Sequence, residues 1–238
     1  MQIEVIANVN EARSDQLAGK TVIVIDVLRA TSNMVVGLAH GCVGIIPVET
    51  IQETFKWQQP GDLRGGERNC KRPAGFDLGN SPFEYMGEEI RGKRIIMTTT
   101  NGTRAMQKTC KAHTVLAGAL LNAASCARAA LGLRRDLVLL CAGTQDVFSL
   151  EDGLCAGMIA SEMLRLAGGE RIAINDFGLA MMGCYEHHRD RLHEALLHSA
   201  NGQRLAKLGF SDDIGYCAQT NRYDLVPVLV DGILVPYH

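Results

Sequence analysis

The chain has 238 residues, which is long enough to bury a substantial core within one α/β domain. Hydrophobic residues make up 47% of the chain and charged residues 21%, a balance that is typical of soluble globular proteins. The formal net charge of −2 excludes a global basic field for DNA or RNA, so any anionic ligand must be attracted by locally placed arginines and backbone amides.

The first two-thirds of the chain alternates short apolar runs with helical stretches. The run 21–27 (TVIVIDV) is typical of a strand that is buried on both faces. We expect further strands at 43–49, 93–99, 113–119 and 136–143, and helices at 30–41, 50–58, 103–110, 122–131 and 150–168. This alternation predicts an α/β fold of the three-layer α/β/α type, with a mostly parallel sheet covered by helices. We assign it to one domain, 1–238, either undivided or built as two tightly packed α/β lobes.

Three segments depart from this alternation. Residues 58–82 are rich in Gly and Pro and are too long for an ordinary connection, which is typical of functional loops. Residues 177–222 are polar and helical, and we interpret their histidine-rich centre, 186–198, as a solvated face, with a lid or a subunit contact as the alternative. The end of the chain predicts a β-hairpin around Asp231-Gly232.

Two stretches of the chain share one plan. Residues 24–49 and 96–120 each read as apolar strand, short polar loop, Arg-Ala, helix and apolar strand. A true half-repeat would place Arg29 and Arg104 in matching positions at one sheet edge, whereas a chance similarity would not; both interpretations stay open.

The cysteines and the N-terminus bear on location. None of the eight cysteines forms a CxxC pair, so a zinc site or redox pair is not predicted. The N-terminus lacks a basic segment followed by a long apolar stretch, and no apolar run approaches the ~20 residues that a membrane span needs. We therefore expect a cytoplasmic protein with reduced thiols and no membrane partner.

The segment IDVLRATS places polar residues directly after the first buried strand. Asp26 ends this strand, where open α/β sheets bind ligands, and its carboxylate suits a metal ion. Arg29 can clamp an oxyanion through its planar guanidinium, and Thr31 and Ser32 lie near a helix N-terminus that favours phosphate. The alternative is that Asp26 only caps the helix and Thr31 packs locally.

Two further clusters carry similar chemistry. In RGGERNCKRPAGFDLGNSP, Glu67 can coordinate a metal and Arg68 can hold an anion, although a solvated loop of turn-forming residues is equally consistent with the pattern. In TTTNGTRA, a strand is followed by groups that can receive a phosphate, namely Asn101, Gly102, Thr103 and Arg104.

Four carboxylates are candidate metal ligands. Glu151 and Asp152 lie near a helix start, a position that the helix dipole alone also explains. A hard divalent cation takes several oxygen ligands, and Asp26, Glu67, Glu151 and Asp152 can supply them. We predict that these carboxylates and the three arginines converge with Asn101 and Thr103 in one pocket at the carboxyl ends of the strands.

Taken together and in this order, the segments VIDVLRATS, GGER, GFDLGNSP, TTNGTRA, CAG, LEDGLCAG and YCAQ resemble the 2-phosphosulfolactate phosphatase family over roughly residues 21–220. The resemblance implies Mg²⁺-dependent hydrolysis of (2R)-2-phospho-3-sulfolactate to (2R)-3-sulfolactate and phosphate, a step that belongs to coenzyme M biosynthesis in archaea. Catalytic roles would then fall to Asp26, Arg29 and Arg104, and substrate binding to Thr31, Ser32, Arg68, Asn101, Gly102 and Thr103.

Several alternatives stay open beside this resemblance. The substrate can be another small anionic 2-phospho acid, or the chain can be an anion-binding module without turnover. A phosphoenzyme on Asp26 is a third alternative, although the D-x-D pattern of haloacid dehalogenases is absent because Leu28 occupies its second acidic position. A homodimer is a separate hypothesis, which rests on the polar helical segment 177–208.

Overall fold

A computed structural model describes residues 1–237 of the chain. Its strands are β1 (Gln2–Ile6), β2 (Thr21–Ile25), β3 (Gly44–Pro47), β4 (Leu63–Gly66), β5 (Arg94–Thr98), β6 (Thr114–Gly118), β7 (Leu137–Cys141), β8 (Ala173–Ile174), β9 (Pro227–Val230) and β10 (Ile233–Pro236). Its α-helices are α1 (Ala30–Ala39), α2 (Ile51–Trp57), α3 (Gly102–Lys108), α4 (Ala123–Leu133), α5 (Leu150–Leu166), α6 (Asp176–His188), α7 (Leu192–His198), α8 (Ala200–Lys207) and α9 (Ser211–Cys217). Short 3-10 turns lie at η1 (Pro82–Tyr85), η2 (Glu88–Ile90), η3 (Leu120–Asn122) and η4 (Arg189–Arg191).

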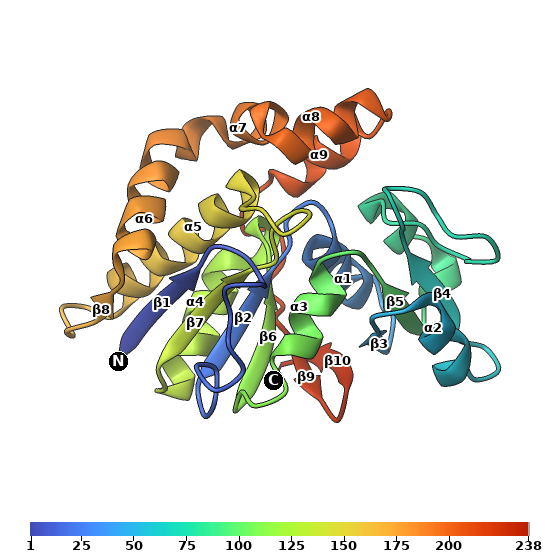
Figure 1. The fold of residues 1–238 in the computed structure, drawn as a ribbon, viewed down its shortest axis with the longest axis horizontal. Coiled ribbons are helices and arrows are strands. Elements are labelled where there is room, and N and C mark those ends of the chain that lie inside the picture. Colours follow the sequence, from blue (N-terminus) through green and yellow to red (C-terminus); the bar gives the residue numbers. More distant parts are fainter. Residues whose placement is uncertain (238) are drawn as a thin grey trace.

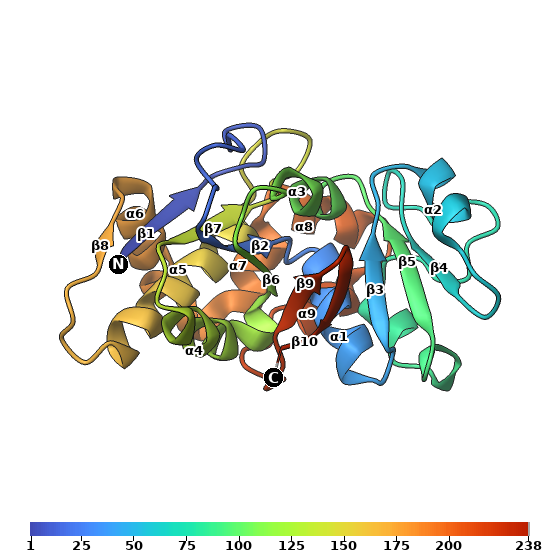
Figure 2. The same cartoon turned by 90° about the horizontal axis from the view of Figure 1, so that it is seen from below.

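All ten strands form one mixed sheet in the order β4-β5-β3-β10-β9-β6-β2-β7-β1-β8. Parallel pairing joins β4, β5 and β3 into one group, and β6, β2, β7, β1 and β8 into a second group. The antiparallel hairpin β9-β10 lies between these two groups and bonds to both (Figure 2). The mostly parallel sheet predicted from the sequence is confirmed.

The hairpin reverses the strand direction between the two groups. The pairs β3-β10, β10-β9 and β9-β6 are all antiparallel, so β3 runs opposite to β6 in the sheet. The unit β2-α1-β3 crosses from the second group to the first, and β5-α3-β6 crosses back. Each of the two stretches that share a plan in the sequence therefore contributes one strand to each group, and the two stretches cross the hairpin in opposite directions.

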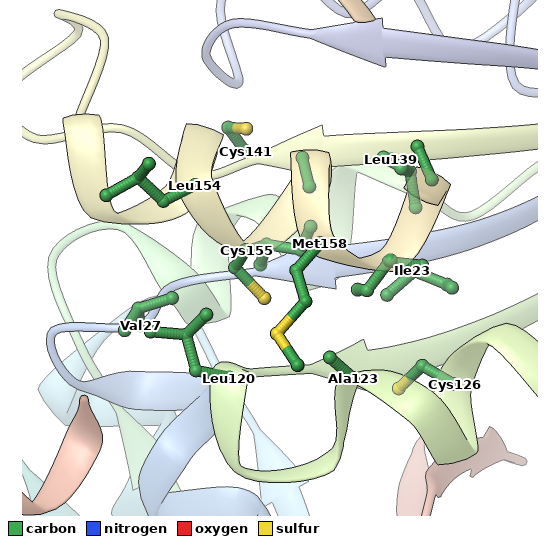
Figure 3. Close-up of a cluster of buried hydrophobic side chains, with 14 of the residues drawn as sticks. Ile23, Val27, Leu120, Ala123, Cys126, Leu139, Cys141, Leu154, Cys155 and Met158 are labelled. Carbon is green, nitrogen blue, oxygen red and sulfur yellow. The ribbon is translucent and has the colours of Figure 1, made fainter. Parts of the chain in front are cut away.

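Helices cover both faces of the larger group of strands, which gives the three layers predicted (Figure 1). Because strand side chains alternate, Ile23 and Ile25 of β2 pack in one hydrophobic cluster with α4 and α5, while Val22 and Val24 pack in another with α1 and α3. Figure 3 shows the first of these clusters, in which Met158 of α5 reaches down toward α4.

The polar segment near the C-terminus is helical, as predicted, and forms α6 to α9. Figure 1 shows α7, α8 and α9 above the ends of the central strands. Asn201 of α8 donates a hydrogen bond of 2.9 Å to the backbone carbonyl of Leu28, in the loop that follows β2. The buried Asp213 of α9 pairs with Arg29 in the same loop. These helices therefore cover the loops at the carboxyl ends of the strands.

Three strands, β1, β4 and β8, lie where the sequence did not predict them, and β8 pairs in parallel with β1. β1 pairs in parallel with β7, and β4 lies inside the segment 58–82 that was predicted as a loop. The hairpin predicted at the end of the chain is confirmed as β9-β10, with positive φ at Asp231 and Gly232. Over the described residues 1–237, no helix combines the length and the apolar character needed to cross a membrane.

Candidate functional site

A pocket lies where loops from several strands meet beneath α8. Its walls come from the loops after β2, β4, β5 and β7, from the turn before η1 and from α8 itself. The lining residues are Asp26, Leu28, Arg29, Glu67, Asn69, Cys70, Asn80, Thr99, Thr100, Asn101, Thr144, Gln145, Asn201, Arg204 and Leu205. The pocket thus lies at the carboxyl ends of strands from both groups, where ligands of open α/β sheets bind.

Asp26 follows β2 and is buried in the pocket wall. Its Oδ1 accepts a hydrogen bond of 3.1 Å from the backbone N–H of Ala30, in the first turn of α1. Burial is the main cause that raises the pKa of Asp26 to about 7; the charges of Glu67 and Glu151 add to this rise, while the N–H groups of Ala30 and Gly102 oppose it. Asp26 therefore combines the helix-capping role with a place in the pocket.

Gly102 allows the starts of α1 and α3 to approach each other. A Cβ atom at this position would lie 2.5 Å from the Cβ of Ala30 and 2.7 Å from Oδ2 of Asp26. Both distances are too short for any side chain, so glycine is required for the backbone of α3 to reach the Asp26 carboxylate.

Glu67 enters the pocket from the loop after β4, with both carboxylate oxygens held. Its Oε1 accepts hydrogen bonds of 2.8 Å from both the N–H and the hydroxyl of Thr100, and its Oε2 accepts one of 2.7 Å from the N–H of Cys70. These bonds tie the loop after β4 to the loop after β5. Because Asp26 and Glu67 line one pocket, their charges repel each other unless a cation or a proton lies between them.

Two tight turns with left-handed backbone flank the pocket. Asn69 and Cys70 have φ of 55° and 63°, and Gln145 and Asp146 have φ of 52° and 65°. Each pair is closed by two backbone hydrogen bonds between its neighbours, as in a type I′ hairpin turn. None of the four residues is glycine, so backbone strain is concentrated beside this pocket, as is common at functional sites.

Glu151 and Asp152 lie in the first turn of α5, behind the pocket wall. Asp152 accepts hydrogen bonds of 2.9 and 3.0 Å from the N–H groups of Val27 and Gly143, which joins the loops after β2 and β7. Glu151 accepts one from Asn201 at 3.2 Å, and its buried Oε2 has no hydrogen-bond partner within residues 1–237. Burial is the first cause that raises the pKa of both carboxyls, that of Asp152 well above its usual range.

The three predicted arginines have different surroundings. Arg29 lines the pocket, but its guanidinium pairs with Asp213 and stacks 4.3 Å from the centre of the Phe210 ring. Arg68 turns away and donates to the backbone carbonyls of Glu67 and Glu49 and to the hydroxyl of Thr98. Arg104 is partly exposed and pairs with Asp146 at 2.6 Å.

The predicted hydroxyls are bonded within their own loops. Thr31 accepts from the N–H of Asp26 and donates to its carbonyl, both at 2.9 Å, and Thr103 makes the same two bonds to Thr99, at 3.1 and 3.0 Å. Ser32 donates to the carbonyl of Val27 at 2.7 Å. All three predicted hydroxyl residues are fully buried, and none lines the pocket.

This repeated bonding pattern explains why Arg29 and Arg104 do not match. In the structure Thr31 corresponds to Thr103, so Arg29 precedes the shared threonine and Arg104 follows it. The expected alignment of the two Arg-Ala pairs is therefore wrong by three positions. Of the convergent set predicted from the sequence, Asp26, Arg29, Glu67 and Asn101 line the pocket, Glu151 and Asp152 adjoin it, and Arg68, Thr103 and Arg104 lie outside its wall.

Several pocket residues were missed by the sequence analysis. Asn201 and Arg204 come from α8, and Thr144 and Gln145 from the turn after β7. The polar helical segment 177–222 gave no signal that Arg204 lines a pocket. The spacing of polar and apolar residues in this segment does not reveal which part of the fold its helices cover.

The carboxylates can be tested for their fit to a divalent cation. Within the described residues, no group of three or more His, Cys, Asp or Glu side chains is arranged so that it could hold a metal ion by itself. Mg²⁺ is usually held by only one or two carboxylates together with waters and substrate phosphates. Asp26 and Glu67, which line one pocket with the buried Glu151 close by, fit that ligand set. Burial is the main cause of the raised pKa of Asp26, and the charges of Glu67 and Glu151, which a cation would offset, add to it.

The chain matches known proteins over almost all of its length. Residues 6–232 match the family model described as 2-phosphosulpholactate phosphatase. A probable 2-phosphosulfolactate phosphatase of Carboxydothermus hydrogenoformans is 44% identical, over 91% of this chain and 90% of that protein. Relatives with the same name are 41% identical in Thermotoga petrophila, covering 91% and 92% of the two chains, and 37% identical in Caldanaerobacter subterraneus, covering 98% of each. The chain belongs to the 2-phosphosulpholactate phosphatase family, as the resemblance indicated, and is an enzyme of the phosphoric monoester hydrolase class.

Proposed function

We propose that this chain is a Mg²⁺-dependent phosphatase that hydrolyses (2R)-2-phospho-3-sulfolactate to (2R)-3-sulfolactate and phosphate. The observation that carries this proposal is the single pocket that contains two carboxylates, Asp26 and Glu67, beside two arginines, Arg29 and Arg204. A substrate with phosphate, carboxylate and sulfonate groups needs several cationic groups, and the net charge of the chain does not supply them. The names of the relatives support the same substrate.

Asp26 and Glu67 would hold the Mg²⁺ ion, with Glu151 near enough for its charge to raise the pKa of Asp26. When bound, Mg²⁺ supplies charge neutralisation on the transferring phosphoryl group and lowers the pKa of a coordinated water. Both oxygens of Asp152 are held by backbone N–H groups, so we propose that Asp152 orients the loop that carries Asp26.

The remaining pocket residues position and neutralise the substrate. Water attacks phosphorus, the P–O ester bond breaks, and the 2-hydroxyl oxygen of sulfolactate leaves with a proton. Arg29, fixed by Asp213, faces the developing charge, and the side-chain amide of Asn101 can donate to a phosphoryl oxygen. Leu28 and Leu205 restrict access of bulk water. Catalysis of this kind depends mainly on positioning and electrostatics.

A malachite-green phosphate assay over a panel of 2-phospho acids tests the proposal. We expect release of phosphate that is abolished by EDTA and restored by added Mg²⁺, and faster turnover of 2-phosphosulfolactate than of 2-phospholactate. Higher activity on another 2-phospho acid would mean that this acid, rather than 2-phosphosulfolactate, is the substrate. Binding without turnover would indicate an anion-binding module.

The attacking group is tested separately. Direct attack by water leaves no label on the protein, whereas a phosphoaspartate is trapped by rapid acid quench with ³²P-labelled substrate. A hydroxylamine-labile label on Asp26 would show that the reaction proceeds through a phosphoenzyme rather than by direct attack of water.

The expected setting of this activity is the cytoplasm, where the eight free cysteines stay reduced. Coenzyme M biosynthesis is the pathway that this activity would serve.

A further inference from the structure

Arg204 differs from the other pocket arginine in having no partner. Arg29 pairs with the buried Asp213 and stacks on Phe210. Arg204 lines the same pocket, yet its guanidinium makes no ion pair or hydrogen bond to any other residue in the range 1–237. A guanidinium carries five N–H donors in a fixed fork, so these donors are free to bind an acceptor that enters the pocket.

The helix that carries Arg204 is firmly anchored. Ser199 caps α8 by accepting a hydrogen bond of 3.0 Å from the N–H of Gly202, and Asn201 donates to the carbonyl of Leu28 and to Glu151. Leu205, next to Arg204, is buried and also lines the pocket. Gly202 packs so closely against the carbonyl of Leu196 that no side chain fits there. Arg204 is thus presented by a rigid element rather than by a free surface helix.

The charge around the pocket defines what Arg204 can bind. Asp26 and Glu67 lie at the carboxyl ends of β2 and β4, and both are engaged with backbone N–H groups or with Thr100. Arg204 enters from the helical cover instead, next to the turn at Asn69-Cys70. A substrate with an anionic group at each end fits a pocket whose metal-type ligands lie on the strand loops and whose unpaired guanidinium lies on the cover.

On the basis of the proposed function, we infer that Arg204 recognises the second anion of the substrate, its carboxylate or its sulfonate, through a two-pronged hydrogen bond. The planar fork matches both groups, which present coplanar or near-coplanar pairs of oxygens. Arg204 would then select phospho acids over phosphate esters that lack a second anion, while Arg29 and the carboxylates serve the phosphoryl end. Selectivity would come from the C-terminal helices and chemistry from the strand loops.

The test compares Arg204→Gln with Lys207→Gln, which removes one positive charge from the exposed side of the same helix. For Arg204→Gln we expect KM for 2-phosphosulfolactate to rise by about tenfold or more, since a charge-assisted two-pronged bond is lost, with kcat within about threefold. Turnover of p-nitrophenyl phosphate, which has no second anion, should stay within about twofold of the wild type. Lys207→Gln should match the wild type on both substrates, and Arg204→Lys should recover only part of the affinity because the fork is lost.

The two candidate anions are distinguished with 2-phospholactate, which keeps the carboxylate but lacks the sulfonate. If Arg204→Gln raises KM for 2-phosphosulfolactate alone, Arg204 binds the sulfonate; if KM rises equally for both acids, it binds the carboxylate. Either result supports the inference. An unchanged KM for both acids, or an equal loss on p-nitrophenyl phosphate, would overturn it, because a guanidinium that only balances charge affects all substrates alike.

Calorimetric binding of 3-sulfolactate separates this inference from the proposed function. A wild-type enzyme that turns over 2-phospho acids, but whose Arg204→Gln variant still binds 3-sulfolactate and keeps its KM, would overturn the inference alone. A wild-type protein that neither turns over 2-phospho acids nor binds 3-sulfolactate would overturn both.

Discussion

Arg29 and Arg104 illustrate how one local pattern leads to two environments. Both precede an alanine in a strand–loop–helix unit, but Arg29 is 2% exposed and paired with Asp213, whereas Arg104 is about half exposed and paired with Asp146 on the outside. Disturbing the geometry of a buried ion pair lowers the stability of the fold far more than disturbing a surface pair, because the remaining buried charge stays desolvated.

The first prediction compares the same substitution at both arginines. Arg29→Lys keeps the charge but loses the fork and the stacking on Phe210, so we expect about 2 kcal/mol less unfolding free energy and at least about tenfold lower kcat/KM. Arg104→Lys should change the unfolding free energy by less than about 0.5 kcal/mol and kcat/KM by less than about twofold. Urea unfolding and phosphate release measure the two effects. Equal losses at the two positions would show that Arg29 and Arg104 have equivalent roles, as the half-repeat interpretation expected.

Gly102 provides the second residue-scale prediction. A methyl group there would clash with Ala30 and with the Asp26 carboxylate, so Gly102→Ala must push α3 away from α1. We expect a loss of about 1–3 kcal/mol of unfolding free energy, typical of overpacking, and a clear loss of activity. Gly132→Ala on the exposed side of α4 is the control, because no atom lies within 4 Å of the added Cβ; it should stabilise the helix by up to about 1 kcal/mol. A fully active Gly102→Ala enzyme would show that the close approach of α3 to Asp26 is dispensable.

At the scale of elements, strands that stand out by apolar runs were predicted and strands defined by pairing were not. β2 is apolar after its first residue, Thr21, β7 is apolar throughout, and both strands are buried on both faces, so their sequences identify them. β4 (LRGG) has two glycines and an arginine, and it is a strand only because β5 offers it a parallel edge. The same edge brings Glu67 to Thr100, so the candidate site depends on a pairing that no local signal encodes.

The start of β4 is held by a two-pronged ion pair between Asp62, which precedes β4, and Arg94, the first residue of β5. Two hydrogen bonds of 3.0 and 2.6 Å join them, and these bonds are the main cause that lowers the pKa of Asp62. A carboxyl whose pKa is lowered by folding stabilises the fold above its usual pKa and loses this contribution as the pH falls through the lowered value.

The third prediction follows from the lowered pKa of Asp62. Asp62→Asn should cost about 1 kcal/mol of unfolding free energy at pH 7, and the difference from the wild type should shrink below pH ~4. Asp15→Asn is the control, because its pair with Lys111 is exposed and worth little. Urea unfolding at several pH values measures both variants. A difference for Asp62→Asn that does not depend on pH would mean that packing, rather than charge, holds the start of β4.

At the scale of the whole molecule, the fold class was predictable and the joining of its two strand groups was not. The βαβ alternation predicts parallel strands covered by helices, and that is observed within each group. The hairpin at the chain end was also predicted, but its place between β3 and β6 depends on long-range pairing of Leu234 with Ile45 and of Leu116 with Val228. Nothing local in the hairpin sequence specifies these partners, and for the same reason the covering position of Arg204 could not be read from its helix.

The central position of the hairpin leads to the last prediction. Leu234 is fully buried in a hydrophobic cluster that contains Ile95 from one strand group and Ala117 from the other, so both groups share its packing. Leu234→Ala should therefore cost about 3 kcal/mol and shift the unfolding of both groups together. The sole tryptophan, Trp57 in α2, reports on the smaller group, and far-UV circular dichroism is dominated by the helices around the larger one. We expect the two signals to give coincident urea transitions in the wild type and in Leu234→Ala, at a lower midpoint in the variant. If fluorescence and circular dichroism instead separate into two transitions, the chain consists of two α/β lobes that unfold independently, and the hairpin does not couple them.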